Sequence, residues 1–565
     1  MLEPQLQHHH PTPSPTLDKT DNSTNPQQNA ILRAGISHFS SNISLLRGSQ
    51  SFNLDFSTHQ ADELWLDVGS QHIRLSNPTT YQLQLNQASH LSLRAVKAHQ
   101  VVSTSLSLPQ TGQDAQGDYY YLPLTQAEIA RLRPLNQDKE HRFKLEINHL
   151  NPQEELVLIA INDLNASQAQ KVQLSYQGEL QPAQDLSTSA HPNSLERTGQ
   201  FDPDHLDLSS ASLSQQTFES CEAQGIGDRC YFSLAVWNAA SQNYQEQRHA
   251  FKLSHIKDGI RFFVDEADGR SLPLNAYGIC ASEAFQIFQG LIQESYDDAD
   301  QSQGVSLVFS SSLAHNGLVR WGDLVKQADI AYLNSNYMKD VTALSLATLY
   351  EEIFHVYHLG YRAKKGLSQP DRFEAESLIG AVLAELKMSE SLSRACGGLG
   401  SSLELATASL SLADLFLMNP HQRNFLNTQG GNDMFEYGLG RLLTSIMNYR
   451  QGDFIQRIIK ANETASAAWA NNTDMTRIIE DAFLSLVLNN NSDFKGYHLS
   501  QDLYKKRDVG YDLHQQLARN SSFSLTDTSQ IDNQSLLILS AKGTGEAVTL
   551  DISFDQGSIL AFIRR

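Results

Sequence analysis

The sequence predicts a multidomain protein in which β modules flank a central α/β unit with a helical C-terminal part. Three observations predict this arrangement. The chain has 565 residues, too many for one hydrophobic core, so roughly two to four domains are expected. Apolar residues recur at every second position from about residue 36 to 190 and again after about residue 500. Between these regions, from Ala284 onward, they recur at the three- and four-residue spacing of helices.

The N-terminal third is expected to be β-rich. Residues 1–30 are dominated by Pro, Gln, Asn, Ser and Thr, which predicts a disordered tail with almost nothing to bury. Residues 31–182 hold short alternating segments between turn residues, typical of one or two β-sandwich-like modules. Residues 183–213 have a linker composition. Representative strand segments are Leu64–Val68, Tyr81–Leu85, Phe143–Ile147 and Val172–Tyr176.

The central region changes period. Residues 214–275 add a β segment, and residues 276–499 combine two predicted strands with six predicted helices. Residues 500–565 return to alternation and predict a small C-terminal β module. The strands are Gly304–Ser310 and Ile330–Leu333, and the helices are Ala284–Tyr296, Ser345–Leu359, Glu374–Lys387, Leu403–Leu417, Tyr437–Tyr449 and Ile478–Leu488.

Charge and hydropathy argue against nucleic-acid binding and against a transmembrane segment. The net charge is −21, and no basic stripe that could neutralise phosphates is visible, so nucleic acid is not expected to bind. No stretch approaches the roughly 20 apolar residues that cross a bilayer, so no transmembrane segment is expected. The N-terminus lacks a basic start followed by an apolar run, so no secretory signal is visible in this chain.

The four cysteines include one close pair. Cys221 and Cys230 enclose a short loop between strand-like segments, a spacing that fits a disulfide closing a hairpin in an oxidising compartment. The alternative is two free thiols.

The stretch most informative about chemistry is Ser345–Tyr361, which predicts one helix ended by Gly360. Glu351, His355 and His358 follow one another at i, i+4 and i+7, with Glu352 beside them, so they share a face. Zinc-binding helices of peptidases carry two His at i and i+4 and a general-base Glu at i+1. Glu352 and His355 fit that pattern, and Glu351 stands where the first His is expected. Taken alone, the pattern also arises by chance on solvated helix faces.

The wider sequence resembles the hyicolysin family of bacterial gluzincin metallopeptidases. In that family an edge strand, a loop with Gly and Asp, and an Asp-Ile-x-Tyr-x-Asn strand precede a Thr-Leu-x-His-Glu-x-x-His helix. A Trp-Leu-x-Glu-Gly-like segment with the third ligand follows the helix. The similar segments here, in the same order, are Gly304–Ser310, Trp321–Leu324, Ala328–Asn334, Thr348–His355 and Phe373–Leu378.

This resemblance implies a thermolysin-type, zincin-like fold for residues 276–499 and hydrolysis of a peptide or protein substrate by metal-activated water. It implies zinc ligands at His355 and Glu376 and a general base at Glu352. Tyr437 is the family's candidate for stabilising the tetrahedral intermediate, although a Tyr packed at a helix start would look the same. The resemblance also implies an exported protein, extracellular or on the bacterial cell surface.

The departure from the family is Glu351. A second carboxylate would offset more of the zinc charge and raise the pKa of a bound water that two imidazoles and one carboxylate bring to about 7. His358, one turn beyond His355, is an alternative ligand, but a His near a helix C-terminus also suits the helix dipole. Three functions remain open: an active metallopeptidase, a catalytically impaired pseudo-peptidase that binds peptides or surfaces, and a β-rich adhesion protein with a coincidental motif.

Overall fold

The computed structural model describes most of the chain between residues 33 and 565. The predicted tail, linker and helix Leu403–Leu417 lie outside the described residues. The described residues are 33–76, 79–133, 141–162, 172–182, 225–238, 240, 243–292, 304–313, 316–325, 328–370, 372–389, 391–397, 434–461, 473–489, 491–499, 523–524, 536–554 and 558–565.

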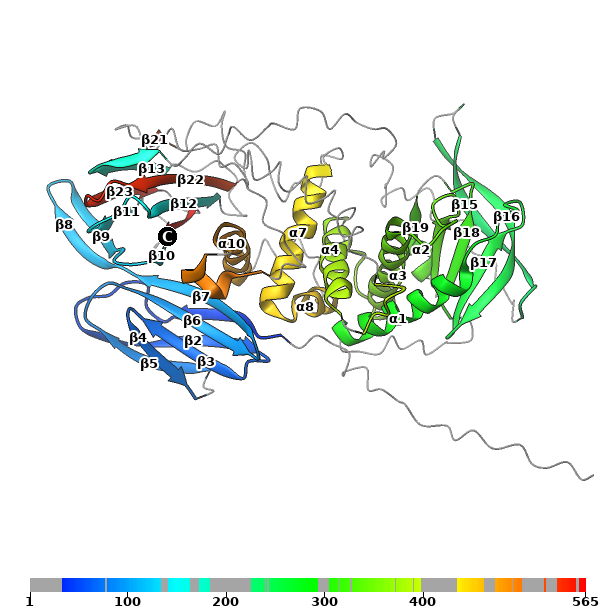
Figure 1. Cartoon of the computed structure of the whole chain (residues 1–565), viewed down its shortest axis with the longest axis horizontal. Coiled ribbons are helices and arrows are strands. Elements are labelled where there is room, and N and C mark those ends of the chain that lie inside the picture. Colours follow the sequence, from blue (N-terminus) through cyan, green and yellow to red (C-terminus); the bar gives the residue numbers. More distant parts are fainter. Residues whose placement is uncertain are drawn as a thin grey trace, which may run out of the picture.

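The molecule has three parts arranged in a row. β sheets lie at one end, helices in the middle, and an α/β unit at the other end (Figure 1). The N-terminal region is mostly β and the helices follow it in the chain, as the change of period predicts. None of the helices in the described part of the chain is long and apolar enough to span a membrane.

Two sheets near the N-terminus face each other. A sheet in the order β1-β2-β5 covers a sheet in the order β4-β3-β6-β7. Alternate residues such as Leu54, Leu66 and Leu93 are fully buried in the shared core, which is why these segments alternate in sequence. The strands are β1 Gly35–Ser41, β2 Gln50–His59, β3 Glu63–Val68, β4 Gln71–Leu75, β5 Thr80–Leu85, β6 Ser89–Lys97 and β7 Gln100–Leu108.

A second pair of sheets mixes both ends of the chain. Their strand orders are β10-β24-β12-β22-β14 and β21-β13-β23-β11-β9-β8, and one core lies between them. The strands are β8 Gln110–Asp114, β9 Gly117–Pro123, β10 Glu128–Leu132, β11 His141–Ile147, β12 Glu155–Asn162, β13 Val172–Gln177, β14 Leu180–Pro182, β21 Phe523–Ser524, β22 Leu536–Gly543, β23 Val548–Phe554 and β24 Ser558–Arg564.

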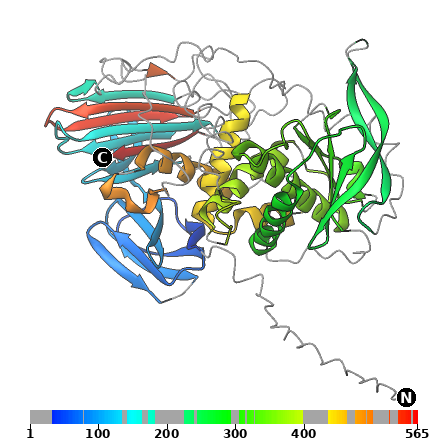
Figure 2. The same cartoon turned by 45° about the vertical axis from the view of Figure 1, so that its right-hand side comes forward.

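The prediction of a separate C-terminal β module is therefore wrong. β22 pairs with β12, β23 lies between β11 and β13, and β24 lies between β10 and β12. In Figure 2 the red C-terminal strands run between the cyan N-terminal ones. Three strands alone cannot bury both of their faces, so they complete the sandwich that the N-terminal strands begin.

The α/β unit is built on a mixed sheet in the order β15-β16-β17-β18-β20-β19. β17, β18 and β20 are parallel, and β19 is antiparallel to β20. The predicted strands around residues 305–309 and 330–333 are β18 and β20, and a division at residue 275 would cut this sheet in two. The elements are β15 Arg229–Asn238, β16 Asn243–Lys257, β17 Ile260–Asp265, α1 Leu274–Ile292, β18 Ser306–Ser310, β19 Gly317–Val319, α2 Trp321–Val325, β20 Ile330–Asn334 and α3 Ala343–Lys364.

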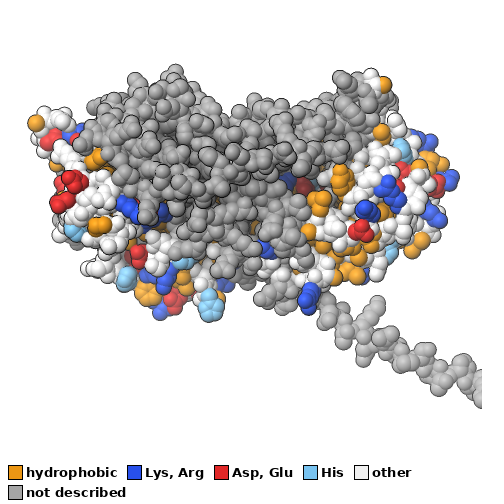
Figure 3. Space-filling model, turned by 45° about the horizontal axis from the view of Figure 1, so that its top comes forward, with side chains coloured by type: hydrophobic (Ala, Val, Ile, Leu, Met, Phe, Trp, Pro, Cys, Tyr) orange, Lys and Arg blue, Asp and Glu red, His pale blue; other side chains and the backbone are white. Residues whose placement is uncertain are grey.

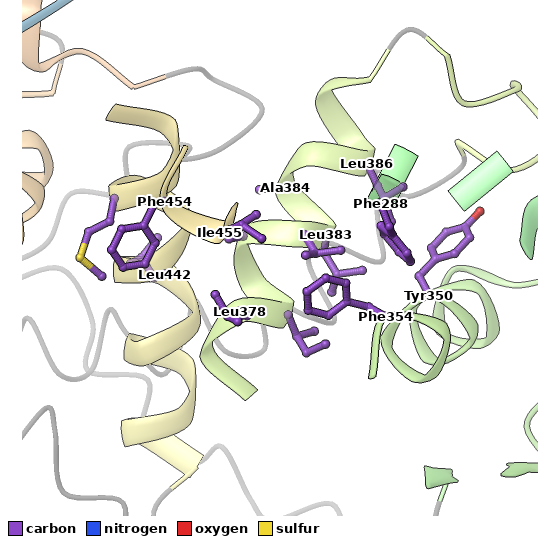
Figure 4. Packing of buried hydrophobic residues seen from close by; sticks show 14 of the residues in the cluster. Phe288, Tyr350, Phe354, Leu378, Leu383, Ala384, Leu386, Leu442, Phe454 and Ile455 are labelled. Atoms are coloured by element: carbon purple, nitrogen blue, oxygen red, sulfur yellow. The ribbon is translucent and has the colours of Figure 1, made fainter. Parts of the chain in front are cut away.

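The helices share one apolar core with this sheet. Figure 4 shows Phe288 and Phe354 packed beside Leu383 and Leu386, with Phe454 on the far side of the cluster. The remaining helices are α4 Arg372–Met388, α7 Met434–Gln451, α8 Phe454–Lys460, α10 Thr473–Leu488 and the 3₁₀ helix η5 Ser492–Tyr497. The helical periodicity of the sequence thus corresponds to helices that bury most of their apolar residues.

A buried charge cluster joins the β modules to the helices. Arg131 of β10 donates to Glu480 Oε2 at 3.0 Å and to Asp481, both on α10. Arg477 donates to Asp481 Oδ2 at 3.2 Å, and Arg450 of α7 donates to the Gly496 carbonyl at 3.0 Å. Burial would raise the pKa of Asp481, but the three guanidiniums lower it below its ordinary value. Asp481 is therefore ionised and central to this contact.

We predict that Asp481→Asn lowers the free energy of unfolding by about 3–5 kcal/mol, because it leaves buried guanidiniums facing a neutral amide. Arg133→Gln is the matched control. Arg133 also pairs with Glu480, but its side chain is 38% exposed, so we expect a loss of only about 0–1 kcal/mol. Urea denaturation measures both. Equal effects of the two variants would contradict a dominant role for the buried cluster.

A disulfide that the sequence did not reveal joins Cys280 of α1 to Cys396, with their Cα atoms 5.3 Å apart. Tyr350 of α3 donates a hydrogen bond to the Cys396 carbonyl at 2.9 Å, so the bridge also holds the segment beside α3. Cys230 is disulfide-bonded as well. Cys221 lies outside the described residues, so its pairing with Cys230 stays a prediction.

We predict that replacing Cys280 and Cys396 together by Ala lowers the free energy of unfolding by about 2–5 kcal/mol, because the bridge closes a long loop. The two cysteines are 116 residues apart in sequence. Denaturation with and without a reductant is the measurement. The reductant should destabilise the wild type more than the double variant, and an equal effect on both would contradict the prediction.

Candidate functional site

Helix α3 carries four of the six candidate residues. Thr342 caps its start, where its side chain accepts a hydrogen bond from the Ser345 backbone at 3.1 Å. The expectation that Gly360 ends the helix is wrong, because α3 runs through Gly360 to Lys364. The turn beyond the helix contains Gly366 at φ +69°, a conformation that favours glycine. Gly360 instead lies buried within the helix.

The four side chains on α3 lie in different surroundings. Glu352 and His355 are buried, whereas the Glu351 side chain is 26% exposed. His358 is fully buried, and its ring stacks on that of Phe354 with centroids 5.8 Å apart. Phe354 belongs to the main apolar core, so His358 also occupies a core position. The alternative that His358 is an exposed or capping residue near the helix C-terminus is therefore wrong.

Glu352 reaches the backbone of strand β19. A Cβ atom on Gly317 would lie 2.2 Å from Glu352 Oε1, closer than any two such atoms approach. A side chain at residue 317 would force the Glu352 carboxylate to move. Among the described strands β19 is the edge strand next to β20, so Glu352 lies beneath the edge of the sheet.

Glu351 forms an ion pair with a residue that the sequence did not single out. Arg441 of α7 donates from Nη2 to Glu351 Oε1 at 3.0 Å, and the Arg441 side chain is 13% exposed. The backbones of α4 and α7 approach closely beside this pair, because a Cβ on Gly380 would lie 2.3 Å from the Arg441 carbonyl oxygen. The sequence feature that could have indicated a cationic partner was Glu351 itself. A carboxylate at a position where a neutral His is expected is stabilised by a nearby positive charge.

Glu376 and Tyr437 are placed only by their backbones. Glu376 lies on α4, one turn before Gly380, and Tyr437 lies on α7, one turn before Arg441. Their side chains lie outside the described residues, so their roles as third ligand and as stabiliser of the intermediate stay predictions.

Among the described side chains no three His, Cys, Asp or Glu residues gather closely enough to hold one metal. The side chain of Glu376, the predicted third ligand, lies outside them. A dication on Glu351 would also lie beside the Arg441 guanidinium, and like charges at that separation repel.

The fold and site define a multidomain protein with β modules and an α/β unit backed by helices. No family model and no curated protein matches the chain, so the hyicolysin resemblance rests on its motifs alone. The chain matches the crystal structure of an aminopeptidase N family protein from Idiomarina loihiensis at 9% identity and a TM-score of 0.25, covering 82% of this chain and 75% of that chain. A likeness at that TM-score carries no conclusion about fold or function.

We predict that Gly317→Ala destabilises the protein by about 1–3 kcal/mol, because the added methyl group collides with the Glu352 carboxylate. In a Glu352→Ala background the same substitution should cost less, since the colliding atoms are gone. Thermal unfolding of the two single variants and the double variant gives the coupling. Additive effects would show that Glu352 does not occupy the space above Gly317.

Proposed function

We propose that the α/β unit is a pseudo-peptidase, a metallopeptidase-like module that binds extended peptides but does not perform zinc-dependent hydrolysis. The observation that carries the proposal is the ion pair between Glu351 and Arg441. It engages the side chain that stands at the first ligand position, and it adds a fixed positive charge at the same place.

Electrostatics supports loss of zinc binding. Zinc in peptidases is held by neutral imidazoles and one carboxylate, which leaves the bound water acidic. Here the predicted first ligand, Glu351, is paired with the guanidinium of Arg441. A zinc ion would have to break this pair and would then be repelled by the nearby guanidinium. The pair is partly shielded from water, with side-chain exposures of 13% and 26%, so screening weakens this repulsion only in part.

The sheet edge supports peptide binding. β19 contributes three residues to the edge, antiparallel to β20, and Leu318 at its centre is half-buried. An extended peptide can add to such an edge through main-chain hydrogen bonds. Glu352 lies directly beneath Gly317 of this strand, so the candidate base is adjacent to the edge where a peptide would bind.

A second candidate function is a metal-dependent peptidase. The observation that favours it is the burial of Glu352 and His355 together on α3, at the spacing of a base and a ligand. Glu376 on the neighbouring helix would be the third contributor. In this reading Arg441 moves away when zinc and substrate bind.

An exported location remains part of the proposal. The buried disulfide between Cys280 and Cys396 supports it, since disulfides persist in oxidising compartments and are rare in the cytosol.

The deciding experiment compares wild type with the double variant Glu351→His, Arg441→Gln. We expect wild type, stripped by a chelator and then dialysed against zinc, to retain far less than one ion per chain and to leave a fluorogenic peptide library intact. The double variant should bind zinc at least about tenfold more tightly, because it gains an imidazole and loses the repelling cation. Zinc content is measured by atomic spectroscopy.

Two controls separate the explanations. Glu351→Gln removes the carboxylate without supplying an imidazole, so it should gain no zinc. Adding Glu352→Gln to the double variant should spare its zinc and remove any hydrolysis it has acquired. Stoichiometric zinc and peptide hydrolysis in the wild type, lost on Glu352→Gln, would sink the pseudo-peptidase proposal and establish the second candidate.

A further inference from the structure

A groove far from helix α3 lies on the outer face of the N-terminal sheet β4-β3-β6-β7. Its volume is about 760 Å³. The sheet forms the floor, and the two walls are residues 126–129 and the 3₁₀ helix η5, which packs against β7. This volume lies within the roughly 300–1,000 Å³ of small-molecule sites.

An ordered tryptophan lies in the floor. Trp65 of β3 faces Arg74 on one neighbouring strand and Arg94 on the other in direct cross-strand register. Both guanidinium carbons lie 5.9 Å from its ring centroid. Its indole N–H donates to Glu63 Oε2 at 3.0 Å. The ring is therefore held between the two guanidiniums.

The charges of the floor are already paired. Arg94 Nη2 donates to Asp67 Oδ1 at 2.8 Å, and His72 Nδ1 lies 2.6 Å from the same oxygen. Outside the groove lining, Arg74 donates to Glu63 at 3.2 Å. These pairs neutralise one another, so the floor offers donors and acceptors side by side without a net charge that would select an ion.

The walls are fixed before any ligand arrives. Asn491 caps η5 by accepting from the Asp493 backbone at 3.0 Å, and Arg450 donates to the Gly496 carbonyl at 3.0 Å. Gly496 packs against Ser103 so closely that a Cβ would lie 2.0 Å from the Ser103 hydroxyl oxygen. The walls bring Glu128, Asp493 and Lys495 to the groove, which again mixes both signs of charge.

We propose that this groove binds an uncharged oligosaccharide. Sugar hydroxyls both donate and accept hydrogen bonds, which matches a floor where guanidinium, carboxylate and imidazole groups alternate. Trp65 lines the groove, so its indole can contact apolar C–H groups of a sugar ring. An anionic ligand fits less well, because the groove is lined by three carboxylates, Asp67, Glu128 and Asp493, and by two cations, Arg94 and Lys495. The groove lies on a different part of the chain, so this inference does not rest on the function proposed for the α/β unit.

The mixture of charges extends beyond the groove. On the face drawn in Figure 3, Lys and Arg side chains are interspersed with Asp and Glu among the described residues at both ends of the molecule. A polar ligand held by shape and hydrogen bonds fits such a surface better than one held by a strong field.

The test uses the full chain and soluble hexasaccharides of β-1,4-glucose, β-1,4-N-acetylglucosamine, β-1,3-glucose and α-1,4-glucose, with heparin hexasaccharide and unfolded casein as comparators. We expect one neutral sugar class to bind saturably in isothermal titration calorimetry, with a Kd of about 10 µM to 1 mM. Tryptophan fluorescence should change on binding, because Trp65 lies in the groove.

Two variants locate the site. Trp65→Ala and Asp67→Asn should each weaken sugar binding at least about tenfold, whereas Tyr231→Ala, which removes an exposed aromatic ring on β15, should leave it unchanged. Asp67→Asn keeps the size of the side chain and serves if Trp65→Ala fails to fold, as judged by circular dichroism. The proposal is overturned if no neutral sugar binds, if binding survives both groove variants, or if only heparin or casein binds through the groove.

Discussion

The buried contact between Arg131 and the two carboxylates of α10 is the constraint on which the arrangement of the parts depends. Arg131 lies on β10, whose neighbour β24 is the last strand of the chain, so the contact involves the first and last thirds of the sequence and the helices between them. A buried charge without a partner costs several kcal/mol, so only one placement of α10 against the β modules satisfies Arg131, Glu480 and Asp481 together. The register of the sandwich and the position of the helices are thereby coupled.

Helix α7 transmits this constraint to the candidate site. Its C-terminal end carries Arg450, which donates to the Ser103 carbonyl of β7 and lies beside Asp481. Nine residues earlier, about 14 Å along the helix, Arg441 pairs with Glu351 of α3. Gly380 of α4 permits the close approach of α7 that brings Arg441 there. The side chain that pairs with Glu351 is thus positioned by a helix whose other end is held by the β modules.

The sequence predicted what depends on local periodicity and missed what depends on long-range pairing. Period-two segments marked strands such as β3 and β23, and the three- and four-residue spacing marked α3. Alternation cannot say which strands will be neighbours, so the C-terminal strands were assigned to a module of their own. The pair of Glu351 with Arg441, 90 residues apart, and the bridge from Cys280 leave no local signature either. The prediction that Gly360 ends the helix failed for a related reason. Tertiary packing overrides the weak helix propensity of a buried glycine.

Helix α3 is held in the α/β unit mainly by apolar packing. A partly exposed ion pair such as Glu351 with Arg441 contributes about 1 kcal/mol at most. The packing of α3 must therefore come from the apolar core, where Phe354 meets Phe288 edge to face at 5.3 Å and Leu383 lies alongside. With the helix held by packing, substitution at residue 351 costs the fold little. In the function proposed above, the side chain at residue 351 is consequently free to vary, and its replacement alters only the affinity for a metal.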